Sequence, residues 1–166
     1  MPSAHDKRPT KTAPKAPRWL TTQEEAAWRA IAKLMVTLPW ALECQLQQDA
    51  GLSFIEYHVL ARLSEDPEHT LRMSELAALT NASLTRLSHL VKRLESRGLV
   101  RREVDPGDGR FTNAILTKPG YTLLVASAPG HVARVRSLVI DQLSSAELRQ
   151  LHDTTERLLA GVDASR

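Results

Sequence analysis

Basic and hydroxyl side chains gather on one side of the segment 83–97, near the middle of the chain. At 100° per residue, an apolar side includes Leu87 and Leu90. The side chains that fall opposite it are Thr85, His89, Lys92 and Ser96, with Arg86 and Arg93 beside them. No acidic residue precedes Glu95 in the segment. Such a surface can donate hydrogen bonds to phosphates and to guanine acceptors in a major groove. A solvated helix surface has a similar composition and is the alternative.

A second candidate group lies in the sequence DPGDGR, which contains Asp108 and Arg110. The glycine, proline and aspartate residues of this stretch favour a hairpin turn. An arginine on a narrow hairpin can enter a minor groove, where the potential is most negative over A·T-rich sequence. The alternative is an exposed arginine in a turn.

Other kinds of chemistry find little support. The sequence has no nucleophile–base motif, no phosphate-binding glycine loop and no cluster with metal-ligand spacing. His58 and His131 could meet in space and bind a metal, but a packed or surface position is the simpler interpretation of each. The single Cys44 excludes an internal disulfide, and its acidic neighbours disfavour a redox sensor. We therefore expect no enzyme activity, no cofactor and no bound metal.

Charge is unevenly distributed along the chain. The net charge of +3 comprises +4 in residues 1–18, −5 in 19–70, +4 in 71–118 and 0 in 119–166. A basic middle between acidic and neutral flanks is typical of a polyanion-binding protein, and a solvated surface is the alternative. Residues 1–18 contain four prolines and predict a disordered basic tail, which either attracts DNA non-specifically or solubilises the chain.

Length and hydropathy limit the class of protein. A chain of 166 residues fits one domain with an oligomerisation arm. No apolar run approaches the roughly 20 residues that a bilayer span needs. The first residues lack the apolar segment of a signal peptide. We therefore expect a cytoplasmic protein with no membrane partner.

The elements that position the candidate side chains can be located from their capping residues. Three segments place a hydroxyl residue three positions before a glutamate and ahead of an apolar periodic run, which predicts a helix start with a capping box. The pairs are Thr21–Glu24, Ser53–Glu56 and Ser144–Glu147. Ser83 is a fourth cap without the glutamate partner.

A short turn joins two of the predicted helices. The helices at 73–80 and 83–97 are separated by only Asn81 and Ala82, and asparagine tolerates the positive φ that such a turn often needs. Gly98 then ends the second of them. Two short strands follow, one on each side of DPGDGR. Two helices across a short turn, followed by a hairpin, describe a winged helix-turn-helix.

Longer helices flank this lobe. The first has a narrow apolar seam formed by Trp28, Ile31, Met35, Leu38 and Leu42. We expect Pro39 to kink or split this helix. A long helix that starts at Thr117 is expected to be interrupted at 129–130, and the last helix covers about 145–159. Because the seam has no partner within a small lobe, it predicts a dimer.

The lobe resembles the DNA-binding lobe of the multiple antibiotic resistance regulator (MarR) family. The matching pieces are SELA, the helix TRLSHLVKRLESRGLV with Arg86 and Ser88, and the wing DPGDGRFTNAILT closed by Thr117 and Gly120. The segment LSFIEYHVLARLSE and the final two helices are also similar. The resemblance covers about residues 20–160.

The resemblance implies a mainly α-helical fold with a small β-wing. A disordered tail (1–18) would precede a single domain (19–166), with a winged helix-turn-helix lobe (53–118) and dimerisation helices (19–52 and 119–166). Members of the family are homodimers, so the resemblance also implies an inverted repeat in double-stranded DNA as the target. The fourth helix would enter the major groove and the wing the adjacent minor groove.

Positions carry over from the family residue by residue. Ser83, Thr85, Arg86, Ser88 and His89 would face bases and nearby phosphates, Lys92 and Arg93 the DNA backbone, and Arg110, oriented by Asp108, the minor groove. The sequence departs from the family at two points. Leu84 replaces a commonly polar residue at the start of the recognition helix, and Gly109 replaces a common second wing arginine. Both departures bear on target preference.

Many members of the family release DNA when a small aromatic or phenolic acid binds between the dimer helices and the DNA lobe. The corresponding candidates are Trp28, Trp40, Phe54, Tyr57, His58, His131 and Arg134, each of which is otherwise a core or surface residue. We therefore expect a repressor or mixed regulator with a small-molecule effector. The alternatives are a metal- or thiol-responsive sensor on the same fold, and a winged-helix protein-interaction module without DNA binding. The basic set of Arg86, Lys92, Arg93 and Arg110 speaks against the last.

Overall fold

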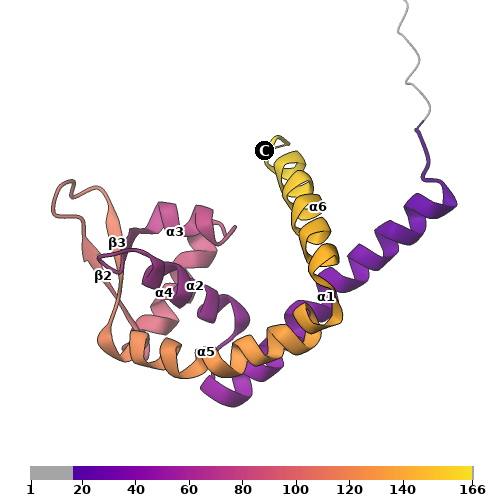
Figure 1. Cartoon of the computed structure of the whole chain (residues 1–166). Helices are drawn as coiled ribbons and strands as arrows, with labels where there is room; N and C mark the ends of the chain where they lie inside the picture. Colours follow the sequence, from indigo (N-terminus) through magenta and orange to yellow (C-terminus); the bar gives the residue numbers. More distant parts are fainter. Residues whose placement is uncertain (1–16, 166) are drawn as a thin grey trace, which may run out of the picture. The chain divides into compact units, whose positions relative to one another are not determined.

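The computed structural model describes residues 17–165, which form helices and a small antiparallel sheet (Figure 1). In chain order the elements are α1 (Thr22–Ala50), α2 (Phe54–Glu65), β1 (Thr70–Arg72), α3 (Met73–Leu79), α4 (Leu84–Ser96), β2 (Val100–Val104), β3 (Thr112–Leu116), α5 (Lys118–Leu138), the 3-10 turn η1 (Ile140–Gln142) and α6 (Ser145–Asp163). The predicted mainly α-helical fold with a small β-wing is confirmed. All but the last two residues of the predicted tail lie outside the described residues.

The chain divides into two compact units, and the boundary lies inside α1 between Met35 and Val36. Pro39 has no N–H to donate to the carbonyl of Met35, so the helix lacks one hydrogen bond at this boundary. The helix nevertheless runs through Pro39 without a break. A single missing bond leaves the hydrogen bonds of the flanking turns intact, and the split that we considered does not occur.

The first unit contains the start of α1 with its predicted capping box. The Thr21 N–H donates to Glu24 Oε2 (2.7 Å) and the Glu24 N–H donates to Thr21 Oγ1 (3.3 Å). Three residues of the apolar seam lie in this unit, and all three are exposed: Trp28, Ile31 and Met35. Their exposure agrees with the prediction that the seam packs against a second copy of the chain.

The second unit contains a lobe in which α2, α3 and α4 share one apolar core. Fully buried side chains from these helices include Leu60, Leu63, Leu76, Leu87, Val91 and Leu94. The sheet adds Val100 and Ala114, and α5 adds Leu124. The apolar side of α4 predicted from its periodicity is therefore the side that packs into the core, which turns its polar side outward.

Three antiparallel strands in the order β1-β3-β2 form the sheet. The β2–β3 hairpin is the predicted wing, and it projects from the lobe (Figure 1). In the central strand Ala114 pairs with Leu71 of β1 and with Arg102 of β2. We did not predict β1, because three residues are too short for a recognisable strand pattern. The segment is a strand because it pairs with β3, which is distant in sequence.

The turn between α3 and α4 has the predicted left-handed residue. Asn81 adopts φ 51°, and the Ala82 N–H donates to the Ala77 carbonyl oxygen (2.9 Å). Ser83 caps α4, with its Oγ accepting from the Arg86 N–H (3.3 Å). These bonds set the direction of the N-terminal turn of α4, which is the leading end of the helix.

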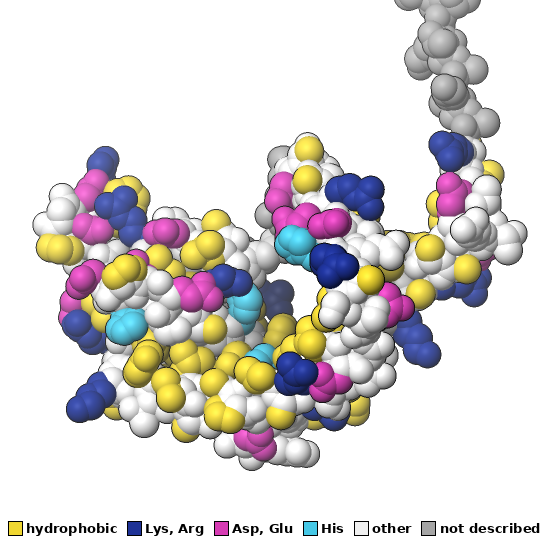
Figure 2. Space-filling view, in the orientation of Figure 1, with side chains coloured by type: hydrophobic (Ala, Val, Ile, Leu, Met, Phe, Trp, Pro, Cys, Tyr) yellow, Lys and Arg dark blue, Asp and Glu magenta, His cyan; other side chains and the backbone are white. Residues whose placement is uncertain are grey.

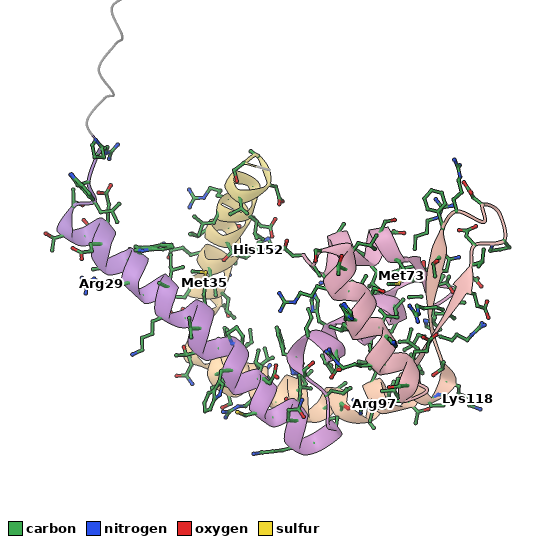
Figure 3. All side chains as sticks on the ribbon, turned by 180° about the vertical axis from the view of Figure 1, so that it is seen from behind. Arg29, Met35, Met73, Arg97, Lys118 and His152 are labelled. Carbon is green, nitrogen blue, oxygen red and sulfur yellow. The ribbon has the colours of Figure 1, made fainter. Side chains whose placement is uncertain are left out.

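The start of α5 packs closely on the chain that follows α4. The Thr117 N–H donates to the Leu99 carbonyl oxygen (3.1 Å). The Thr117 hydroxyl donates to the Gly98 carbonyl oxygen (2.7 Å) and accepts from the Gly120 N–H (3.1 Å). A Cβ on Gly120 would lie 2.1 Å from the Leu99 oxygen, so the packing excludes any side chain there. Figure 3 shows Arg97, the C-cap of α4, and Lys118, the first residue of α5, at the same end of the lobe. The junction anchors the long α5 to the lobe.

The predicted interruption of α5 at Pro129 and Gly130 is wrong, because the helix is continuous from Lys118 to Leu138. Side chains from the last turns of α1 pack against this point. A Cβ on Gly130 would lie 2.7 Å from Asp49 Oδ2 and 3.3 Å from Gln45 Nε2. The helix is thus packed closely against α1 at this point, and it continues although Pro129 lacks a hydrogen bond donor.

The last helix, α6, starts with the predicted capping box of Ser144 and Glu147. It extends four residues beyond the predicted end at Leu159. None of its residues is buried within the described chain. Its exposed apolar side chains are Leu151, Leu158, Leu159 and Val162. As at the start of α1, apolar residues at helical spacing are left without cover from the described residues.

Candidate nucleic-acid interface

The outward side of α4 carries the polar residues predicted to face DNA. Five of these side chains are exposed: Thr85, Arg86, His89, Lys92 and Arg93. Ser88 is half-buried, and Ser83 is an exposed N-cap. The N-terminus of a helix carries a partial positive charge and unpaired N–H groups, both of which favour a phosphate. The leading end of α4 thus combines hydrogen bond donors with a favourable field for a polyanion.

The wing presents one strongly oriented arginine. Arg110 donates through Nη2 to Asp108 Oδ2 (2.6 Å) and through Nε to Asp108 Oδ1 (2.9 Å). The hydrogen bonds from Arg110 hold the pKa of Asp108 below its ordinary value, and Asp108 raises the pKa of Arg110. The Arg110 side chain stays 84% exposed. Figure 2 shows basic and acidic side chains gathered at the tip of the projecting hairpin.

Asp105 organises the base of the wing. Its carboxylate accepts from the Gly107 N–H (2.8 Å) and from Arg72 Nε (3.1 Å). The Gly107 N–H is the main cause that lowers the pKa of Asp105, and Arg72 lowers it further. The Arg72 guanidinium also stacks on Phe111, 4.6 Å from the ring centroid. Arg72 therefore ties the start of α3 to the wing.

A hollow of about 250 Å³ lies between α3, the leading end of α4 and the wing. Its lining comprises Met73, Ser74, Leu84, Ser88, Arg102, Arg110, Phe111 and Thr112. Figure 3 places Met73 between the helices of the lobe and the strands of the wing. The hollow joins the outward side of α4 to the wing arginine, so a single ligand surface can contact both.

Arg93 has an intramolecular partner as well as an exposed position. Its Nε donates to Glu56 Oε1 (3.3 Å), which links α4 to α2. Burial works to raise the pKa of Glu56, but the hydrogen bonds from Ser53 and the charge of Arg93 outweigh it and leave the pKa below its ordinary value. We predicted that Arg93 faces the DNA backbone; 60% of its side chain is exposed, so the ion pair and a phosphate contact are compatible.

Replacing Glu56 by glutamine is expected to destabilise the protein by about 1 kcal/mol near neutral pH. Glutamine preserves the capping box but loses the charge partner of Arg93. Because the pKa of Glu56 is lowered in the folded state, its contribution is present above the pKa of an unfolded glutamate. It is lost as the pH falls through the lowered value. Urea unfolding at a series of pH values should show wild type and variant converging toward acid.

The control is Glu65, which forms an exposed ion pair on the same helix. Arg62 Nη1 donates to Glu65 Oε2 in this pair (2.8 Å). Glu65→Gln should change stability by no more than about 0.5 kcal/mol, because solvent screens the pair. Equal losses for Glu56→Gln and Glu65→Gln would show that the buried position of Glu56 contributes nothing.

Four of the predicted effector residues come together on α2 and α5. Tyr57 and His131 rings lie 4.4 Å apart between centroids, and Phe54 lies 6.2 Å from His58 and 6.4 Å from His131. Burial lowers the pKa of both histidines. The described residues offer no hydrogen bond partner to the buried His131 Nδ1. This aromatic cluster, defined by these four residues, favours neutral imidazoles over charged ones.

The other three predicted effector residues are not part of the aromatic cluster. Arg134 follows His131 by one turn of α5 and is half-buried. Trp40 is 70% exposed and lines a separate hollow on α1 with Pro39 and Cys44. Trp28 belongs to the first unit. Among residues 17–165, no three His, Cys, Asp or Glu side chains are grouped so that they could hold a metal ion.

Sequence reasoning missed the residues that brace the wing. Arg72 contacts Asp105 across 33 positions of sequence and Phe111 across 39, and no local pattern connects it to them. Asp105 carried one recognisable signal. An aspartate two residues before a glycine favours an Asx turn, and the Gly107 N–H does donate to its side chain.

Comparisons with known proteins agree with this geometry. The MarR family model matches residues 50–110. Sco3205, a MarR family transcriptional regulator from Streptomyces coelicolor solved in complex with DNA, is 43% identical over 87% of this chain and 91% of its own, with a TM-score of 0.85. AbsC, a MarR family transcriptional regulator from the same organism, is 38% identical over 89% of this chain and 99% of its own, also with a TM-score of 0.85.

A curated relative gives the same result at lower identity. The transcriptional repressor MprA of Escherichia coli (strain K12) is 27% identical over 113 residues, or 68% of this chain. The chain spans 64% of the length of MprA. The fold, the wing and these similarities agree, and the chain belongs to the MarR family.

Proposed function

We propose that the chain is a homodimeric, sequence-specific DNA-binding transcription regulator that acts as a repressor on a palindromic operator. The observation that carries this proposal is the pairing of two surfaces on one side of the lobe. The exposed donors of α4 adjoin a wing arginine that Asp108 holds outward. Sco3205 was solved in complex with DNA, and its 43% identity to this chain supports DNA as the partner here.

Homodimerisation is supported by the apolar residues that the described chain leaves uncovered. They belong to the start of α1 and to α6, the two regions that we predicted to be dimerisation helices. Residues 118–142 also reach the length and mean hydropathy of a membrane span. Val125 and Val132 of α5 are more than half exposed. A second copy of the chain provides cover for these side chains without a membrane, in keeping with a cytoplasmic location.

The purified chain is expected to be a dimer at micromolar concentration and to enrich an inverted repeat from a pool of random duplexes. Two recognition helices on a two-fold axis should sit about 34 Å apart, one turn of DNA, so the half-sites should have that spacing. Light scattering and sequencing of the enriched duplexes measure the two properties. A monomer, or a pool that remains random, would contradict the proposal.

We further propose that a small aromatic acid releases the protein from its operator by binding at the aromatic cluster. Phe54, Tyr57, His58 and His131 provide ring surfaces, and His131 Nδ1 provides a buried nitrogen available to a ligand. Arg134 lies one turn away and supplies positive charge for a carboxylate.

A further inference from the structure

Leu84 is an exposed apolar residue at the leading end of α4. It is the first residue of the helix and 54% exposed. The other leucines on the helix face the core, with Leu87 at 1% and Leu90 at 4% exposure. Burial in the lobe therefore accounts for those leucines and leaves much of the Leu84 side chain open to a partner.

The surroundings of Leu84 combine polar and apolar side chains. It lines the hollow between α4 and the wing together with the polar Ser74, Ser88 and Arg110 and with the apolar Met73 and Phe111. Along the helix it is followed by the exposed Thr85. Hydrogen-bonding groups thus adjoin a partly exposed aliphatic side chain where the start of the helix faces the wing.

The direction of the side chain follows from helix geometry. Side chains on an α-helix lean toward its N-terminus, so a residue in the first position projects ahead of the helix. A recognition helix contacts base edges with its N-terminal residues. In the major groove the one apolar group on the base edges is the C5-methyl of thymine.

We propose that Leu84 is a specificity-determining residue that packs against a thymine methyl group in each half-site of the operator. This inference rests on the proposed function, and it adds which base the helix prefers and by what contact. Arg86 and the hydroxyl residues supply hydrogen bonds to other base edges, whereas Leu84 distinguishes thymine from bases that lack the methyl.

Replacing thymine by deoxyuridine tests the contact on the DNA side, because it removes only the methyl. The duplex is the one that the wild-type chain enriches from a random pool, and each thymine is exchanged in turn. At one thymine of each half-site, wild-type affinity should fall about fourfold, the effect of uncovering one buried methyl. Exchanges at the other thymines should leave the affinity unchanged.

Two variants test the same contact on the protein side. Leu84→Ser should bind the thymine and deoxyuridine duplexes equally, because its side chain is short and polar. Leu84→Met keeps an aliphatic side chain and should retain most of the fourfold preference. Leu79→Ala is the control, since Leu79 is another leucine of the lobe that is 48% exposed, and this variant should preserve the preference in full.

The outcomes separate this inference from the proposed function. If wild type enriches an operator but tolerates deoxyuridine at every thymine, the Leu84 contact is overturned and DNA recognition stands. The same holds if Leu84→Ser keeps the full preference for thymine. If wild type enriches no sequence, the proposed function and the Leu84 contact fail together.

Discussion

Replacing Gly120 by alanine is expected to lower the free energy of unfolding by about 3 kcal/mol or more, which is the upper range for overpacking. A Cβ at this position would lie 2.1 Å from the Leu99 carbonyl oxygen and 2.9 Å from Leu116 Cδ1. The nearer atom is backbone, and Thr117 holds it with a hydrogen bond, so it cannot swing aside as a flexible side chain would. Relief of the clash requires α5 to move away from the lobe.

Helix propensity alone predicts that Gly120→Ala would raise the free energy of unfolding. The expected decrease therefore distinguishes the clash from the effect of propensity. Within a helix, alanine is normally more favourable than glycine by about 1 kcal/mol. A Cβ on Gly161 in α6 would meet no atom within 4 Å, so Gly161→Ala is the matched control and should be neutral or stabilising. Urea unfolding of both variants measures the difference. Equal stability of Gly120→Ala and wild type would contradict the close packing of α5 on the lobe.

Replacing Arg86 by alanine is expected to reduce discrimination at one base position of each half-site by about 1–3 kcal/mol. Arg86 is exposed near the leading end of α4, where a guanidinium can form a paired contact with guanine O6 and N7. The side chain is not needed for the helix cap, because Ser83 Oγ accepts from the backbone N–H of this residue. Affinities for a panel of single-base operator variants at fixed salt measure the loss.

Lys92→Ala is the matched control on the same side of the helix. Lys92 lies further from the leading end and should touch phosphate only. Its removal should weaken all operator variants alike and reduce the slope of log affinity against log salt by about one for each phosphate that is no longer neutralised. If Arg86→Ala and Lys92→Ala weaken every operator variant by the same factor, then α4 does not lie in the major groove as proposed.

The features that depend on neighbouring residues could be predicted. The capping boxes at Ser53 and Ser144, the left-handed Asn81 and the apolar side of α4 all appear in the structure. Each arises from atoms within about one helical turn of each other, so residue type and spacing carry the information. The position of the wing and of its turn followed from the same local signals.

Proline effects and residue partnerships were predicted less well. Pro129 suggested an interruption of α5, yet packing of Asp49 and Gln45 against Gly130 accompanies a continuous helix. Arg93 was expected at the DNA backbone, and the structure adds an ion pair with Glu56 on another helix. In both cases the contact that the sequence did not predict comes from an element that is distant in sequence.

By itself, the sequence determined the helices of the lobe, the hairpin and the polar outward side of α4, because caps, turns and periodicity are local properties. Only the tertiary structure decided that a third strand, β1, pairs with Ala114 and that Arg72 braces the wing through Asp105 and Phe111. It also decided that Gly120 must lack a side chain. These features depend on which distant segments approach each other, and that follows from burying one shared core rather than from any short stretch of residues.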